Sequence, residues 1–269
     1  MRGLPRSPEH GRRFRRATAF VIAILALSWP GRPAAARSPD DPIRLAWQEG
    51  DVAGVTRILS ADGGRTIGFI DYHQHRTGDR LEMVRVAHFN DGSSDEDHAE
   101  ARVGETLEAL RGRSIIRDTR GRPTVDITID VTNGHVSGFS GRDKDRQNYD
   151  EQLTLPAGTY WEPLISLVVK NFVQNASDDR LVFHTIAMTP KPREIDMELA
   201  AGGETSIVRP GGQLKVVHYT LKPTINFLID PIIQRLAPKT EFFIEPGTPP
   251  AMIRFAGPRN YAGQHIRIE

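Results

Sequence analysis

The stretch PTVDITIDVTNG, residues 123–134, decides the fold class. Apolar and polar side chains alternate strictly along it, since single polar residues separate Val125, Ile127 and Ile129. Successive side chains of a β-strand point to opposite faces, so this pattern predicts a strand with one face on a core and the other in water. Asn133-Gly134 follows, and both residues tolerate the positive φ angles of a tight hairpin. Residues 135–139 are expected to return as the next strand.

The same pattern continues on both sides of this hairpin. Turn residues recur about every 8 to 15 residues, which indicates a meander of antiparallel strands. The further strands that we expect are 43–48, 54–59, 66–75, 80–89, 114–118, 181–189, 193–200, 205–209, 213–221, 240–245, 251–256 and 264–268. The sequence therefore predicts a mainly β protein with one large, curved antiparallel sheet, either a half-barrel or an open barrel.

Two helices are expected to interrupt the strands. The segment WEPLISLVVKNFVQ, 161–174, begins near Pro163, a favourable first-turn residue, and apolar residues cover more than half of its circumference. A helix this apolar is expected to be buried, with the curved sheet wrapping it. The other helix is predicted at the surface, from Ser94 to about Leu110, because Ser94 and the acids after it can cap a helix N-terminus.

The N-terminal residues have the layout of a secretory signal peptide. Four arginines between Arg12 and Arg16 precede an uncharged apolar run, and Ala34-Ala35-Ala36 fits a signal peptidase site. The run from Ala17 to Trp29 is shorter than the roughly 20 residues that span a bilayer, so we interpret it as cleaved. The prediction is a signal peptide over 1–36 and a single β-rich domain over 37–269, in the periplasm or secreted. Sec and twin-arginine export both stay open.

Charge and cysteine content exclude several classes of protein. The part after Ala36 holds 28 Lys and Arg against 33 Asp and Glu, so it is mildly acidic. Phosphate binding needs a positive surface, which argues against a nucleic-acid partner. The chain has no cysteine and therefore no disulfide, thiolate metal site or Cys nucleophile. We expect no transmembrane segment after the signal peptide, and no cofactor.

One half of the chain resembles a family of exported bacterial proteins of unknown function that are related in shape to the periplasmic lipoprotein carriers. The resemblance lies in LTLPAGTYWEPLISLVVKNF, 153–172, where a Leu-Pro-x-Gly turn leads into an apolar helix, and in the strand GGQLKVVHYTLKP, 211–223. It extends over residues 65–225 as a pattern of elements. The resemblance implies a half-barrel with a helix inside and a cavity for an apolar molecule.

Polar motifs offer one metal candidate and no catalytic constellation. In DYHQH, 71–75, the side chains of Asp71, His73 and His75 share one face of a strand, and His88 or His218 would have to complete a zinc site. The alternative is the wet face of an edge strand. The chain contains neither a G-x-S-x-G elbow nor a phosphate-binding glycine loop, which favours a non-enzymatic protein.

The apolar run FLIDPIIQRLAP, 227–238, predicts a short amphipathic helix that starts at Asp230-Pro231 after an apolar strand. It is expected to cover the protein's own core, a ligand-filled mouth or a membrane surface. Together with the buried helix it suggests an apolar pocket lined by Trp161, Leu164, Ile165, Val168, Phe172, Phe227, Ile229, Ile232, Ile233 and Leu236.

Three functions remain open. The first is a non-enzymatic periplasmic protein that binds or carries an apolar ligand such as a lipid, because small-molecule sites often lie in the mouths of barrels. The second is an envelope scaffold with a protein partner and no ligand. The third is a metal-dependent enzyme that uses His73 and His75. Ligand identity, partner and oligomeric state are beyond what the residues indicate.

Overall fold

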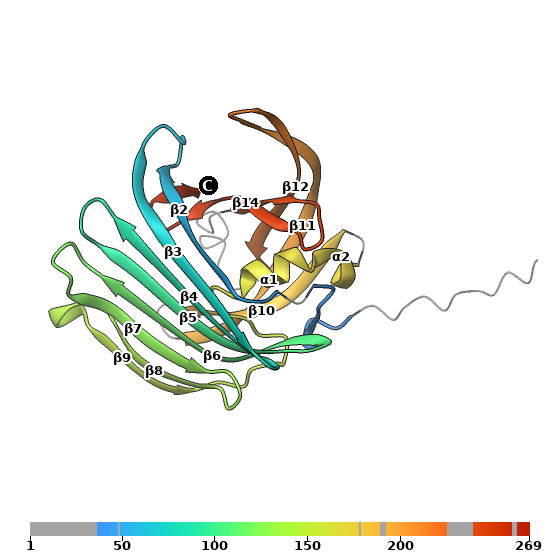
Figure 1. The fold of residues 1–269 in the computed structure, drawn as a ribbon. Helices are drawn as coiled ribbons and strands as arrows, with labels where there is room; N and C mark the ends of the chain where they lie inside the picture. The colour runs from blue at the N-terminus through green and yellow to red at the C-terminus, as the bar shows by residue number, and fades with distance from the viewer. Residues whose placement is uncertain (1–36, 48, 178, 189–191, 225–238, 260–262) are drawn as a thin grey trace, which may run out of the picture. The chain divides into compact units, whose positions relative to one another are not determined.

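One antiparallel sheet contains all the β-strands of the described chain (Figure 1). The computed structural model describes residues 37–47, 49–177, 179–188, 192–224, 239–259 and 263–269. The chain divides into two units, 1–35 and 36–269, and every described residue belongs to the second. The mainly β, antiparallel prediction is therefore confirmed.

The elements follow one another along the chain with few helices between them. They are β1 (Ile43–Arg44), β2 (Val52–Ser60), β3 (Thr66–Thr77), β4 (Arg80–Phe89), β5 (Ser94–Val103), β6 (Thr106–Arg117), β7 (Pro123–Asp130), β8 (His135–Ser140), the 3-10 helix η1 (Asp143–Asp145), β9 (Gln147–Gln152), α1 (Ile165–Lys170), α2 (Phe172–Asn175), β10 (Arg180–Met188), β11 (Pro192–Arg209), β12 (Gly212–Pro223), β13 (Thr240–Glu245), β14 (Ala251–Pro258) and β15 (His265–Ile268). None of the helices among the described residues is long and apolar enough to cross a membrane.

The sheet is two meanders joined side by side. Strands β2 to β9 pair in chain order, β10 to β15 do the same, and β15 pairs with β2. The two ends of the sheet are then β9 and β10, so within the described residues it is open. The free edge of β10 is partly covered by the segment before α1, where Thr159 forms a parallel bridge with His184.

Alternation along the strands sends one face of the sheet to the core. In β7 and β8, Ile127, Ile129 and Val136 are at most 2% exposed. The sheet curves, and we call the face that carries these residues the concave face (Figure 1). The main hydrophobic cluster joins it to α1 and α2 through Leu164, Val168 and other helix residues.

The helix predicted over 94–110 is wrong, because this segment forms β5 and most of the first half of β6. Asp95 and Asp97 occupy concave-face positions of β5 where apolar residues would normally announce a strand. Both acids bond to side chains from other parts of the chain, Asp97 to Arg85 of β4 and Asp95 to Arg259 just after β14, so tertiary partners override the local helix signal. The expected surface helix thus becomes a pair of central strands.

The helix predicted over 161–174 exists but is shorter and divided. α1 covers Ile165–Lys170, and α2 begins at Phe172 after a break at Asn171. The Asn171 side chain accepts hydrogen bonds from the backbone of Ala46 (2.8 Å) and Trp47 (3.4 Å), which ties the helix to the N-terminal segment. Val173 is 82% exposed, although the apolar pattern of 161–174 predicts a buried side chain there.

Two features had no signal in the sequence. Strand β9 is an edge strand in which Tyr149 alone is buried, so its residues show little apolar alternation. Helix η1 is a single exposed 3-10 turn. The short surface helix expected at 231–237 lies outside the described residues.

Candidate functional site

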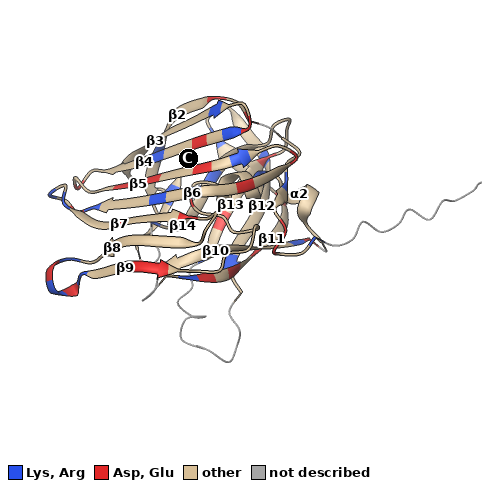
Figure 2. Cartoon of the chain, turned by 90° about the horizontal axis from the view of Figure 1, so that it is seen from below, with Lys and Arg blue, Asp and Glu red and all other residues tan. Residues whose placement is uncertain are grey.

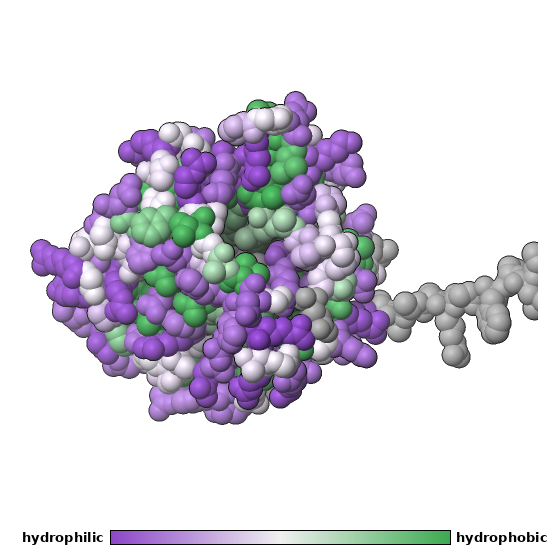
Figure 3. All heavy atoms as spheres, viewed as in Figure 1, coloured by the Kyte–Doolittle hydropathy of each residue, from purple (hydrophilic) through white to green (hydrophobic). Residues whose placement is uncertain are grey.

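The concave face carries apolar side chains that are only half-buried. Tyr72, Val217, Phe255 and Trp161 pack against the main cluster and keep part of their surface accessible. Gly54 lies opposite Tyr72 in the β2–β3 register, and a Cβ at Gly54 would meet no atom within 4 Å. A space-filling view shows a hollow with apolar atoms between the β2–β3 and β11–β12 hairpins (Figure 3). This hollow is the candidate ligand site.

A charged cluster lies on the same face, next to Tyr72. Arg85, which pairs with Tyr72 in the β3–β4 register, bonds through Nη2 to Asp97 (2.7 Å) and approaches Glu162 through Nη1 (3.3 Å). The second Asp97 oxygen accepts a hydrogen bond from Ser114 Oγ at 2.7 Å. Loss of hydration raises the pKa of Glu162, while the Arg85 guanidinium opposes the rise. Both signs of charge are distributed over β3 to β6 (Figure 2).

A second arginine completes this concave cluster. Arg259, just after β14, binds both oxygens of Asp95 at 2.7 and 2.8 Å, and its guanidinium lies 3.5 Å from the ring centre of Phe89. Bidentate guanidinium–carboxylate pairs are the strongest geometry for an ion pair in proteins. Each oxygen of Asp95 and Asp97 therefore has a donor without any ligand.

Trp161 joins the charged cluster to the helix. Its ring lies so close to Gly112 of β6 that a Cβ there would be 2.6 Å from Trp161 Cδ1. Among the described residues, the buried Nε1 of Trp161 has no hydrogen-bond partner. A buried donor without a partner is uncommon, so Trp161 offers a hydrogen bond to a ligand that reaches it.

The structure gathers half of the residues predicted to line an apolar pocket. Leu164, Ile165, Val168 and Phe172 are at most 6% exposed and lie in the main cluster, with Trp161 packed against it. The other five, Phe227, Ile229, Ile232, Ile233 and Leu236, lie outside the described residues, as does the rest of 227–238. The pocket lining stays a prediction.

The histidines proposed for a zinc site lie on the convex face of β3. His75 Nδ1 is 3.1 Å from Asp51, and His73 is exposed. His88 instead pairs with Asp71 (3.3 Å), and His218 pairs with Glu241 (3.1 Å). Among the described residues, no group of three metal-binding side chains includes His73 or His75.

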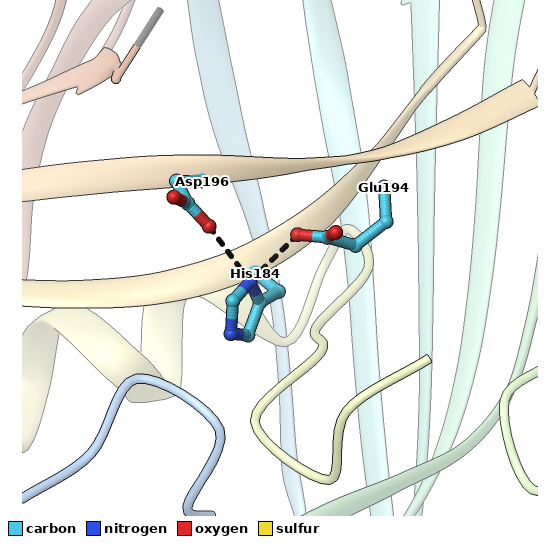
Figure 4. A group of neighbouring side chains, drawn as sticks. All are labelled: His184, Glu194 and Asp196. Atoms are coloured by element: carbon cyan, nitrogen blue, oxygen red, sulfur yellow. Dashed lines mark hydrogen bonds and ion pairs between the residues drawn. The ribbon is translucent and has the colours of Figure 1, made fainter. Parts of the chain in front are cut away.

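A different histidine is surrounded by acids at the edge of the sheet. His184 of β10 lies directly opposite Asp196 of β11, and its Nδ1 is 2.9 Å from Asp196 Oδ1 and 2.6 Å from Glu194 Oε1 (Figure 4). Its Nε2 is 3.0 Å from Asp40 Oδ1 in the N-terminal segment. We call His184, Glu194, Asp196 and Asp40 the edge cluster.

Sequence reasoning missed both clusters. A period-two signal was present for β5, where Asp95, Asp97, Ala99, Ala101 and Val103 alternate with other residues, but two acids hid it. His184 and Glu194-x-Asp196 both fall in predicted strands, yet their meeting depends on a strand register that the residues do not reveal.

Comparisons with known proteins assign no family to the chain. No family model matches the chain, and no curated protein matches it. One solved structure, a beta-barrel-like protein of the domain of unknown function DUF1849 from Brucella abortus, is 8% identical, with a TM-score of 0.42. The match covers 84% of this chain and 95% of that chain. The fold described above rests on the strand registers of the chain itself.

Proposed function

We propose that the protein is a non-enzymatic, exported protein that binds an apolar or amphipathic ligand, such as a lipid, in the hollow of the concave face. In this proposal the curved sheet wraps α1 and α2 and leaves its mouth between β2 and β12. The observation that carries the proposal is the set of half-buried apolar side chains, Tyr72, Val217 and Phe255, on top of an otherwise closed core. Burial of acyl surface there would drive binding, at about 0.8 kcal/mol per CH₂.

The polar groups beside the hollow suit a ligand with one polar end. Trp161 Nε1 has no hydrogen-bond partner within the described residues, and the Glu162 side chain keeps 40% of its surface accessible next to Arg85. Ligand sites are typically apolar with a few placed polar groups. We therefore expect a single-chain amphiphile, with its acyl part on Tyr72 and Phe255 and its polar end near Trp161.

Tryptophan fluorescence tests this binding directly. After removal of the predicted signal peptide the chain keeps Trp47 and Trp161, so a Trp47→Phe variant reports on Trp161 alone. Titration with a nitroxide-labelled fatty acid is expected to give saturable, one-to-one quenching. Removal of two methylenes from the chain should weaken binding by roughly fifteenfold, because about 1.6 kcal/mol is lost.

A matched pair of variants locates the site. Gly54→Leu places a side chain in the open space of the concave face, whereas Val55→Leu makes a similar change on the convex face, where Val55 is 70% exposed. The first is expected to weaken binding at least tenfold and the second to leave it unchanged. Equal affinities in the two variants would contradict a site in the hollow.

Export is tested separately from binding. N-terminal sequencing of the protein from its own cell envelope is expected to begin at Arg37, and native mass spectrometry is expected to show a co-purified lipid. A chain that starts at Met1 in the cytoplasm would contradict export. A ligand-free protein that gives no quenching but crosslinks to one envelope protein would instead support the scaffold function.

A further inference from the structure

The edge cluster carries more negative than positive charge. Three carboxylates, Asp40, Glu194 and Asp196, surround one imidazole, which carries at most one positive charge. Within the described residues, no Lys or Arg side chain forms an ion pair with any of these three acids. Like charges this close repel each other unless a cation lies between them.

We propose that His184, Glu194 and Asp196 bind a divalent transition-metal ion, of which Zn²⁺ is the reference. Their ligand atoms all lie within 4.8 Å of one another. Imidazole nitrogen combined with carboxylate oxygen suits Zn²⁺ and its first-row neighbours, whereas Mg²⁺ and Ca²⁺ prefer oxygen alone. A divalent ion would also neutralise the two carboxylates that face Nδ1.

Asp40 occupies the position of an outer-shell partner. A histidine that binds metal through one ring nitrogen almost always donates the other N–H to a carboxylate or carbonyl. Asp40 Oδ1 is 3.0 Å from Nε2, so in the metal-bound form the Nε2–H would donate to Asp40 and the Nδ1 lone pair would point to the ion between Glu194 and Asp196. Without a metal ion, a single Nδ1–H would have to serve two carboxylate oxygens, which lie at 2.6 and 2.9 Å.

The hydroxyl of Thr159 gives independent support. Thr159 is 1% exposed, and its Oγ1 has no hydrogen-bond partner in the part of the chain that the structure describes. It forms the parallel bridge with His184, and bridge partners in a parallel pair project to the same face of a sheet. A buried hydroxyl without a partner next to His184 is what a metal ion or its bound water would satisfy.

The distances leave room for an ion after small adjustments. Zinc–ligand bonds of about 2.1 Å at the tetrahedral angle place neighbouring ligand atoms about 3.4 Å apart. The two Nδ1–oxygen distances are 2.6 and 2.9 Å, so rotations of the Glu194 and Asp196 side chains complete the geometry. These two side chains are 31% and 47% exposed, which gives an ion access from water.

Calorimetric titration of Zn²⁺ into the untagged, EDTA-treated protein is the test. One equivalent is expected to bind saturably, and Glu194→Gln and Asp196→Asn should each weaken it at least tenfold. Asp40→Asn should weaken Zn²⁺ binding roughly tenfold, because loss of a carboxylate that orients a metal-binding histidine typically has this effect. Glu241→Gln is the matched control, because Glu241 contacts His218 in a similar pair at 3.1 Å without further acids.

Circular dichroism of each variant separates loss of binding from loss of fold. The proposal is overturned if no saturable equivalent binds, or if folded Glu194→Gln and Asp196→Asn proteins bind Zn²⁺ as tightly as the parent. It is also overturned if His73→Ala abolishes the binding, because the ion would then lie on the convex face of β3. X-ray absorption at the zinc edge is expected to show one imidazole with oxygen ligands.

Discussion

The concave cluster and the edge cluster hold similar acids but different cations. Asp95 and Asp97 face Arg259 and Arg85, whose guanidinium groups carry a permanent charge and match the carboxylates in geometry. The three acids of the edge cluster face a single imidazole. The difference teaches that arginines of the protein neutralise the carboxylates of the concave cluster, whereas the carboxylates of the edge cluster need the added metal ion that we propose.

The two clusters also differ in how they are built. The concave cluster is spread over β4, β5 and β6 with Glu162 and Arg259, and it keeps the Asp97 side chain 8% exposed. The edge cluster lies on the free edge strand β10 and its neighbour β11, and the Asp40 side chain is 70% exposed. Removal of one partner should therefore have a large effect in the first cluster and a small one in the second.

The largest effect is expected from Arg85→Leu. The variant leaves Asp97 buried without its cation, so the free energy of unfolding should fall by about 3 kcal/mol in urea titrations followed by circular dichroism. Arg113→Leu is the control, because Arg113 makes a two-bond pair with Asp126 at 3.0 Å on the wet face. The free energy of unfolding of Arg113→Leu should fall by less than about 1 kcal/mol. Equal losses of unfolding free energy in the two variants would show that an ion pair on the concave face stabilises the fold no more than one on the convex face.

A smaller effect is expected from Asp196→Asn in metal-free protein. Asp196 is 47% exposed and lies among other acids, so the free energy of unfolding should change by less than about 1 kcal/mol in EDTA. In Zn²⁺ at a hundred times the parent's dissociation constant, the parent should gain about 2.7 kcal/mol of unfolding free energy and the variant at most about 1.4 kcal/mol. A loss as large as that of Arg85→Leu in EDTA would mean that the edge cluster is a complete salt bridge.

The smallest effect concerns pH and Glu162. Its pKa in the folded protein is raised above the ordinary 4.5 by burial, so the folded state holds the proton over a wider range. The resulting stability is present below pH 4.5 and is lost as the pH rises through the folded pKa. Partial exposure limits the difference from Glu162→Gln to below about 0.5 kcal/mol. Urea unfolding of the parent and of Glu162→Gln from pH 4 to 8 measures this difference in free energy. Free energies of unfolding that depend on pH in the same way in both proteins would contradict the raised pKa of Glu162.

Much of the fold could be predicted because alternation is a local property. The strand over 123–131 and its return after Asn133-Gly134 appear as β7 and β8, and residues 161–174 do contain helical turns, α1 and most of α2. The prediction failed at 94–110, where buried acids replaced the apolar residues that usually mark a strand. Local patterns cannot reveal that Arg85 and Arg259 will neutralise them.

By itself, the sequence determined the mainly β, antiparallel fold class and the lack of disulfides, and it indicated buried apolar positions such as Leu164, Val168 and Phe172. These follow from side-chain chemistry and periodicity along a single segment. Only the tertiary structure decided where charges meet. Asp40, Thr159 and the β10–β11 hairpin that carries His184 and Glu194 come from three separate parts of the chain. The β10–β11 register, the parallel bridge and the hydrogen bond from Gly158 N to Asp40 O bring them together. A shift of one residue in that register would turn His184 away from Asp196, because side chains alternate between the faces of a strand.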